Sequence, residues 1–132
     1  MQKMMAMPIV VDVTHTLTGA KCLARDVSEI YGKVILVIGM LSDKDLDGVS
    51  RELAPIAERV FVTAPNSPRR AAPELMGEVM SRYHDDVTVI PTVAEAMEAA
   101  MECREDLNVL ATGSFRTAED VLVWFQEIFA RS

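Results

Sequence analysis

Arg59-Val-Phe-Val-Thr63, followed by Ala64-Pro65-Asn66-Ser67-Pro68-Arg69-Arg70, is the stretch that decides the fold. Its first five residues are typical of a buried β-strand, and the two prolines after them stiffen the turn that leaves the strand. The turn ends in two arginines where an open α/β sheet usually holds its ligand. A guanidinium can donate two parallel hydrogen bonds to a carboxylate or phosphate, so Arg69 and Arg70 are candidate anion-binding residues. The alternative is that both are solvated loop charges.

Four further apolar runs, residues 9–13, 33–39, 86–90 and 108–112, are rich in β-branched residues and do not alternate with polar ones. Such runs are typical of strands in a sheet that is covered on both faces. The spacing of apolar residues predicts five amphipathic helices between and after these strands. The first, second and fifth are expected over residues 19–31, 46–57 and 117–131; the third begins at residue 73, and the fourth ends at residue 103. Strand alternating with helix implies right-handed crossovers. The sequence therefore predicts a three-layer, Rossmann-like α/β fold with a mainly parallel sheet and helices on both faces.

Several residues predict where the helices begin, end or pack. Pro55 is expected to end or tighten the second helix, and Pro73 to open the third. Thr92 and Glu95 predict a capping box at the start of the fourth. The last helix has one apolar stripe, which we interpret as core against the sheet, with membrane or partner docking as the alternative; it consists of Val121, Trp124, Phe125, Ile128 and Phe129.

The composition limits the class of protein. The 132 residues suffice for one domain, and a formal net charge of -7 argues against nucleic-acid binding. Cys22 and Cys103 lie far apart in predicted helices, so we expect neither a metal site nor a disulfide, and a reducing cytoplasm fits best. The first residues lack the pattern of a signal peptide, and no apolar run reaches the roughly 18 residues that a membrane span needs.

Ligands of such sheets bind beyond the carboxyl ends of the strands, so the turns there are read together. Four of these turns carry motifs: Val11-Asp12-Val13-Thr14-His15-Thr16, Gly39-Met-Leu-Ser-Asp43-Lys44-Asp45, Thr63-Ala-Pro-Asn-Ser-Pro68-Arg69 and Leu110-Ala-Thr-Gly113-Ser114. In that order they resemble D-x-A-H-[NT]-P, G-x-x-x-D-K-D, T-x-P-x-[SN]-P-R and L-V-T-G-S, the elements of the C-terminal domain of the Mur ligase superfamily. The resemblance is strongest to folylpolyglutamate synthases and covers nearly the whole chain.

The resemblance implies an enzyme that joins glutamate to a pteroyl-glutamate carboxylate. ATP phosphorylates the carboxylate, the glutamate amine attacks the acyl phosphate, and magnesium steadies the phosphates. The C-terminal domain closes over a central ATPase domain. By resemblance, Asp12 and His15 would face the nucleotide, and Arg69 and Ser114 would lie nearer the glutamate. Supporting roles would fall to Asp43, Lys44, Asp45, Arg70 and Gly113.

Each of these residues also has a structural explanation. Asp12 could hydrogen-bond to its own turn, His15 could be a solvent-facing turn residue, and Ser114 could cap the last helix. The acids around Lys44 could complement the dipole of the second helix. His84 is expected to be a surface residue. The chain departs from the family pattern where Thr14 replaces alanine and Leu17 replaces proline, which leaves the first turn less constrained.

The chain contains no G-x-x-x-x-G-K-[ST] phosphate loop and no G-x-G-x-x-G motif. We therefore expect one Mur ligase C-terminal-like domain over residues 1–132 that cannot ligate alone and that uses ATP and Mg²⁺ only with a central ATPase domain, in cis or in trans. Its small ligand would be glutamate or a related carboxylate, and a homodimer could form through the face that otherwise meets the ATPase domain. The alternative is a non-catalytic module that binds a small anion or another protein. An independent enzyme of other chemistry has no visible nucleophile–base pair or metal-ligand spacing to support it.

Overall fold

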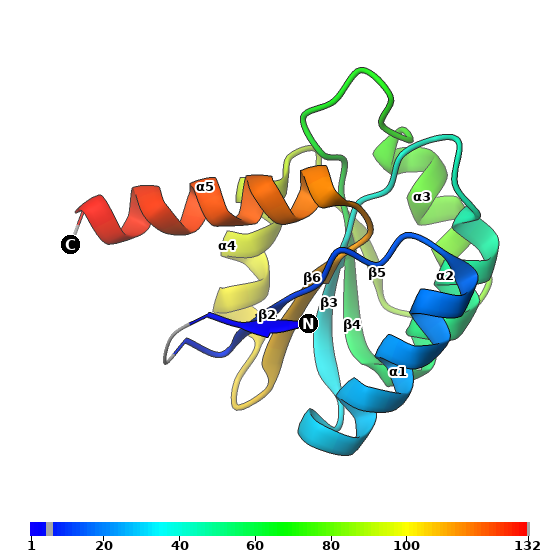
Figure 1. The fold of residues 1–132 in the computed structure, drawn as a ribbon, viewed down its shortest axis with the longest axis horizontal. Coiled ribbons are helices and arrows are strands. Elements are labelled where there is room, and N and C mark those ends of the chain that lie inside the picture. Colours follow the sequence, from blue (N-terminus) through cyan, green and yellow to red (C-terminus); the bar gives the residue numbers. More distant parts are fainter. Residues whose placement is uncertain (5–6, 132) are drawn as a thin grey trace.

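The computed structural model describes residues 1–4 and 7–131. These residues form a six-stranded sheet in the order β1-β2-β6-β3-β4-β5. Among the described strands, β1 is antiparallel to its neighbour and all other pairings are parallel. β3 and β6 pair at the centre of the sheet, so their carboxyl ends meet there (Figure 1). The strands are β1 (Gln2–Lys3), β2 (Ile9–Val11), β3 (Val34–Ile38), β4 (Ala57–Val62), β5 (Val87–Val89) and β6 (Asn108–Thr112).

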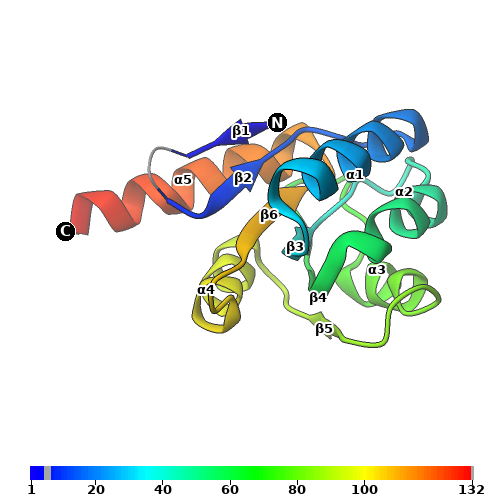
Figure 2. The same cartoon turned by 90° about the horizontal axis from the view of Figure 1, so that it is seen from below.

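Helices cover both faces of this sheet. Helices α1, α2 and α3 lie on one face, and α4 and α5 lie on the other (Figure 2). The predicted three-layer α/β fold with a mainly parallel sheet is therefore confirmed. The helices are α1 (Leu17–Tyr31), α2 (Leu46–Leu53) with the 3₁₀ turn Ala54–Ile56 after it, α3 (Pro73–Met80), α4 (Val93–Cys103) and α5 (Phe115–Arg131).

Strand β3 shows why the apolar runs are continuous. All five of its residues are buried. Leu36 and Ile38 belong to the core under α1, α2 and α3, whereas Ile35 and Val37 belong to the core under α4 and α5. Because successive side chains of a strand point to opposite faces, a sheet with two covered faces needs an apolar residue at every position.

Most differences from the predicted boundaries come from capping residues and turns. Helices α1 and α5 begin two residues earlier than predicted, at Leu17 and Phe115, because side chains just before them satisfy their first N–H groups. β4 begins at Ala57, two residues before the predicted start, because Ala57 still pairs with Val34 beside an irregularity in register. β2 ends at Val11, and residues 12 and 13 already belong to the following turn. The two-residue β1 was not predicted, since it carries no apolar pattern.

Three predicted local features can be compared directly with the structure. Pro55 lies in the 3₁₀ turn that follows α2, so the predicted tightening is confirmed. The hydroxyl of Thr92 accepts the Glu95 N–H at 3.3 Å, which confirms the cap at the start of α4. The predicted capping box is realised only in this half, because the Glu95 carboxylate accepts the Thr92 hydroxyl at 2.8 Å instead of the Thr92 N–H. His84, predicted as a surface residue, is half-buried, with Nε2 at 2.7 Å from the Ala57 carbonyl oxygen. That prediction was wrong because the sequence does not show this contact across 27 residues.

The apolar stripe of α5 is only partly core. Val121 and Trp124 are buried, and Phe125 and Ile128 pack at the edge of the core. Phe129 is 64% exposed, so its predicted burial was wrong. Its position explains this, because the C-terminal part of α5 extends beyond the sheet (Figure 1). In the part of the chain that the structure describes, no helix has the length and apolar character needed to cross a membrane.

Candidate functional site

The four predicted loops meet at one edge of the sheet. The Thr112 hydroxyl, at the end of β6, lies 3.5 Å from the carbonyl oxygen of Thr14 in the loop after β2. The Gly39 N–H, after β3, donates to the Thr112 carbonyl oxygen at 3.2 Å. The Ser42 N–H donates to the Arg69 carbonyl oxygen at 2.8 Å and so joins the loops after β3 and β4. We call this edge the loop rim; it comprises residues 12–16, 39–45, 63–70 and 112–115.

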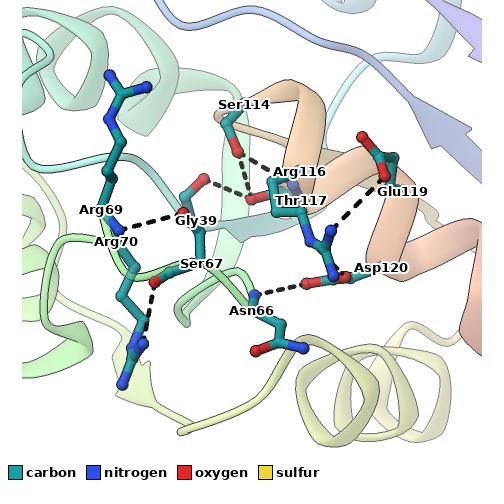
Figure 3. Close-up of polar contacts among 10 residues, drawn as sticks. All are labelled: Gly39, Asn66, Ser67, Arg69, Arg70, Ser114, Arg116, Thr117, Glu119 and Asp120. Atoms are coloured by element: carbon teal, nitrogen blue, oxygen red, sulfur yellow. Dashed lines mark hydrogen bonds and ion pairs between the residues drawn. The ribbon is translucent and has the colours of Figure 1, made fainter.

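Ser114 lies at the centre of the loop rim and caps α5. It is 3% exposed, and its hydroxyl oxygen accepts the Thr117 N–H at 3.0 Å. The Thr117 hydroxyl lies 2.9 Å from the Ser114 hydroxyl and donates to the Gly39 carbonyl oxygen at 2.7 Å (Figure 3). The capping role left open by the sequence is therefore present. The predicted contact of this hydroxyl with glutamate stays a prediction, and it would have to compete with these bonds.

Gly113 brings the ends of β3 and β6 into direct backbone contact. Its φ of 122° is a conformation that side chains rarely permit. A Cβ at this position would lie 2.2 Å from the Gly39 carbonyl oxygen. Gly113 therefore permits the close approach of the two strand ends, whereas its predicted supporting role at a ligand site stays a prediction.

Asp12 and His15, the predicted nucleotide-facing residues, are both engaged by their own turn. Asp12 accepts hydrogen bonds from the Thr14 N–H at 2.8 Å and from the Thr14 hydroxyl, and pairs with the Met1 ammonium group at 2.8 Å. Partial burial opposes ionisation, but the bonds from the ammonium group and Thr14 outweigh it, so the pKa of Asp12 lies below its ordinary 3.8. His15 Nδ1 lies 2.9 Å from the Val13 carbonyl oxygen, and its ring faces that of Phe115 at 6.1 Å.

Arg69 is paired within the loop rim. Its Nη2 lies 2.7 Å from the Asp43 carboxylate, and both side chains are more than half exposed. Desolvation would raise the pKa of Asp43, but the hydrogen bond and charge of Arg69 outweigh it and lower the pKa. Asp45 caps α2 by accepting the Gly48 N–H at 2.9 Å, and Lys44 N–H donates to the Leu41 carbonyl oxygen at 3.3 Å. The structure thus contains the predicted helix-start role for Asp45, whereas Asp43 orients Arg69.

The order of these loops on a sheet of this topology can be compared with known proteins. The family model described as the Mur ligase, glutamate ligase domain matches residues 1–115. The chain belongs to this family. The resemblance that the sequence motifs indicated is thereby confirmed.

Relatives of the glutamate ligase domain family are similar over most of this chain. The dihydrofolate synthase/folylpolyglutamate synthase of Haemophilus influenzae is 34% identical over 122 residues, which are 85% of this chain and 27% of the relative. The structure of Escherichia coli FolC in complex with ADP has a TM-score of 0.83 and 28% identity, over 92% of this chain and 29% of that one. A Yersinia pestis bifunctional folylpolyglutamate synthase/dihydrofolate synthase with Mn, AMPPNP and L-glutamate bound has a TM-score of 0.78 and 25% identity, over 94% and 30%. The chain therefore spans less than a third of the length of these relatives.

The departures from the family pattern have local consequences. Thr14, in place of alanine, supplies the hydroxyl that donates to Asp12. Leu17, in place of proline, is the first residue of α1, after the Thr16 side chain that caps the helix. The first turn of this chain is thus held by side-chain hydrogen bonds. In the family pattern, a proline at the position of Leu17 would restrict the backbone of this turn instead.

The sequence did not indicate which residues hold the loop after β4 against α5. We call this loop, residues 64–70, the arginine loop. The Asn66 N–H donates to the Asp120 carboxylate at 2.7 Å across 54 residues (Figure 3). Arg116 Nε lies 3.3 Å from the other Asp120 oxygen, an ion pair without hydrogen-bond geometry, and Arg116 also approaches Glu119 at 3.8 Å. The four-residue spacing of Arg116 and Asp120 on a helix was the one available signal, and it predicts a helical ion pair rather than a loop anchor.

Arg70 does not share the surroundings of Arg69. Its Nη1 donates to the Ser67 carbonyl oxygen at 2.9 Å, and the side chain lines a cavity between the loop and helices α4 and α5. The two arginines that the sequence treated as a pair are therefore divided. One is bound by a carboxylate of the loop rim, and the other faces a cavity.

Proposed function

We propose that residues 1–132 form a single glutamate ligase domain that provides one side of the cleft of an ATP-dependent ligase similar to folylpolyglutamate synthase. The ligase would add glutamate to a folate carboxylate. Arg69 would hold a carboxylate of the incoming glutamate, and Asp12 and His15 would face the nucleotide. The free thiols of Cys22 and Cys103 are consistent with a reducing cytoplasm.

The observation that carries this proposal is the convergence of the four family motifs on the loop rim. The loops after β2, β3, β4 and β6 are joined there by hydrogen bonds between their backbones and side chains. Ligands of parallel α/β sheets bind beyond the carboxyl ends of the strands, which is where the rim lies. The exposed guanidinium of Arg69 is suited to bind a ligand carboxylate, because it already pairs with the carboxylate of Asp43.

The described residues do not supply a site for the metal on their own. Among residues 1–4 and 7–131, no group of three or more His, Cys, Asp or Glu side chains could hold a metal ion. Magnesium prefers oxygen ligands together with phosphate oxygens of the nucleotide. We therefore assign the magnesium ligands and the phosphate cradle to a central ATPase domain, and expect this chain to be inactive alone.

A reconstitution assay tests the proposal. The chain is mixed with a candidate central-domain protein, and ATP-dependent addition of labelled glutamate to a folate is measured. Addition should require both components, and Arg69→Ala should lower it by about tenfold or more, the effect of losing a charged hydrogen bond. Arg82→Ala is the matched control, because Arg82 is similarly exposed and pairs with Asp47 at 3.1 Å on another part of the surface. The absence of stimulation with every candidate partner would count against the proposal.

One observation favours a second function, a non-catalytic module that binds a small anion or another protein. The groups expected to receive the ligands are already engaged, Asp12 by Thr14 and Arg69 by Asp43. Calorimetry with glutamate, ATP and folates separates the two functions. Glutamate binding that Arg69→Ala abolishes supports the ligase, whereas indifference to all three ligands supports the module.

A further inference from the structure

A cavity of about 540 Å³ adjoins the loop rim and shares Ala64, Pro65, Asn66 and Arg70 with it. Its lining contains none of the four residues expected to contact glutamate or nucleotide directly, which are Asp12, His15, Arg69 and Ser114. It is bounded by the loop after β4, the first residues of α4 and the middle of α5. Its volume falls within the roughly 300–1,000 Å³ of pockets that hold small molecules. The lining combines apolar residues with a few charged ones, which is the usual composition of such pockets.

One part of the lining is electropositive. Arg70 uses one N–H for the Ser67 carbonyl oxygen, and among the described residues no carboxylate pairs with it. Val93 and Ala94 are the first two residues of α4 and also line the cavity. The N–H groups at these positions of a helix have no intrahelical acceptor, and they carry the positive end of the helix dipole. A guanidinium and a helix start, from different elements, thus border the same cavity.

The rest of the lining is mainly apolar. Pro65, Pro91 and Val123 line the cavity together with Trp124. Trp124 is 4% exposed, and its buried indole Nε1 has no hydrogen-bond partner within the described part of the chain. An apolar wall that includes an aromatic side chain suits an aromatic ring.

Two acids also line the cavity, and they limit the charge of a ligand. Asp120 is occupied, because it accepts the Asn66 N–H and pairs with Arg116. The Glu127 carboxylate has no ion pair with any of the residues in the described ranges. It therefore contributes an uncompensated negative charge on the α5 side of the cavity. A second anionic group on the ligand would be repelled there.

We propose that this cavity is a binding site for small aromatic monocarboxylates. The carboxylate would lie on Arg70 and the first turn of α4, and the ring would pack against Trp124 and Val123. The site is separate from the one proposed for glutamate, which uses Arg69. Because the assay below measures binding alone, its outcome does not depend on ligase activity.

Trp124 is the single tryptophan of the chain and lies in the cavity wall, so its fluorescence reports occupancy directly. The 132-residue chain is titrated with 3-phenylpropionate, and we expect a saturable change in emission. Arg70→Ala should weaken the affinity by about tenfold or more, as expected for loss of a charged hydrogen bond. Arg69→Ala, on the same loop, is the matched control and should leave the affinity within about twofold. Circular dichroism confirms that each variant is folded.

Two other ligands and one more variant define the ligand class. Neutral 3-phenylpropionamide and the dianion glutarate should both bind about tenfold more weakly than 3-phenylpropionate. Val123→Asp places an acid in the cavity at a residue that is 53% exposed, so it should abolish binding without unfolding the chain. The proposal is overturned if the emission of Trp124 does not saturate with 3-phenylpropionate up to about 10 mM. The binding free energy would then be at most roughly 3 kcal/mol in magnitude. Equal losses in Arg69→Ala and Arg70→Ala, or equal binding of the amide, would overturn it as well.

Discussion

Replacing Gly113 by alanine should destabilise the protein strongly and for two separable reasons. The backbone at this residue has φ of 122°, and forcing a residue with a side chain into such a conformation costs about 1–3 kcal/mol. The new Cβ would also lie 2.2 Å from the Gly39 carbonyl oxygen. Since Cβ atoms do not approach other atoms closer than 3.0 Å, the end of β3 or of β6 must move by about 1 Å.

This displacement has its own cost. Inserting a methyl group into a well-packed site costs about 1–3 kcal/mol, because the surrounding backbone must shift. The displaced carbonyl of Gly39 is also the acceptor of the Thr117 hydroxyl at 2.7 Å, so that bond is weakened too. We expect Gly113→Ala to lose about 2–6 kcal/mol in total, a large part of the 5–15 kcal/mol that is typical of a small protein.

Gly32→Ala is the matched control. Gly32 also has a positive φ, 72°, but a Cβ there would meet nothing within 4 Å. It should therefore lose only the conformational part, about 1–3 kcal/mol. Urea unfolding, followed by circular dichroism and by the fluorescence of Trp124, measures both variants. Equal losses within about 0.5 kcal/mol would refute the reasoning, because the contact between Gly113 and Gly39 would then not constrain the loop rim.

Three other changes test the loop rim. Thr117→Val should cost about 1–3 kcal/mol of unfolding free energy and Thr117→Ser less, because only the valine removes the hydroxyl that pairs with the Gly39 carbonyl oxygen and the Ser114 hydroxyl; equal losses in urea unfolding would contradict this. Asp12 has a pKa below its ordinary value in the folded state, so its stabilising effect is present above about pH 4 and is lost as the pH falls further. Asp12→Asn should thus destabilise the protein at pH 7, and the stability difference from the unmodified protein should narrow toward pH 3; a constant difference would refute the assignment. Asp120→Ala releases the Asn66 N–H and should speed tryptic cleavage of the arginine loop, whereas Glu119→Ala should not; equal rates would show that Asp120 is no anchor.

The fold could be predicted because the apolar runs that indicate single strands agree with the alternation of strands and helices along the chain. The run Asn108–Thr112 is strand β6 as predicted, since apolar residues on both faces of a central strand leave few alternatives. Strand β1 could not be predicted from Gln2 and Lys3, which are polar and pair with β2 through their backbone. Phe129 shows a related limit. Helical spacing places it on the core stripe, but the spacing does not tell where the sheet beneath the helix ends.

The candidate site was predictable in position but not in its contacts. The motifs place Arg69 and Ser114 after strand ends, and parallel strands bring those ends to one edge. Which partner each side chain chooses depends on residues distant in sequence. Asp43 meets Arg69 across 26 residues, and Asn66 meets Asp120 across 54. Such pairs follow from the way the loops pack, for which the sequence alone carries no periodic signal.

The two proposed sites, the loop rim with Arg69 and the cavity with Arg70, differ in whether a carboxylate of the protein already pairs with the arginine. On the loop rim, an incoming carboxylate would meet a guanidinium whose charge Asp43 already compensates by a contact of 2.7 Å to Nη2, one of the nitrogens that carry its five N–H donors. Both side chains are largely exposed, so Asp43 and water both compete with that carboxylate for the guanidinium. The rim alone should therefore bind anions weakly, and a second surface that excludes water would strengthen the contact. The cavity differs because no carboxylate among the described residues pairs with Arg70, which is also exposed, and because the buried indole of Trp124 forms part of the wall and excludes water from that side. Binding by the isolated chain should thus be detectable at the cavity before it is detectable at the rim.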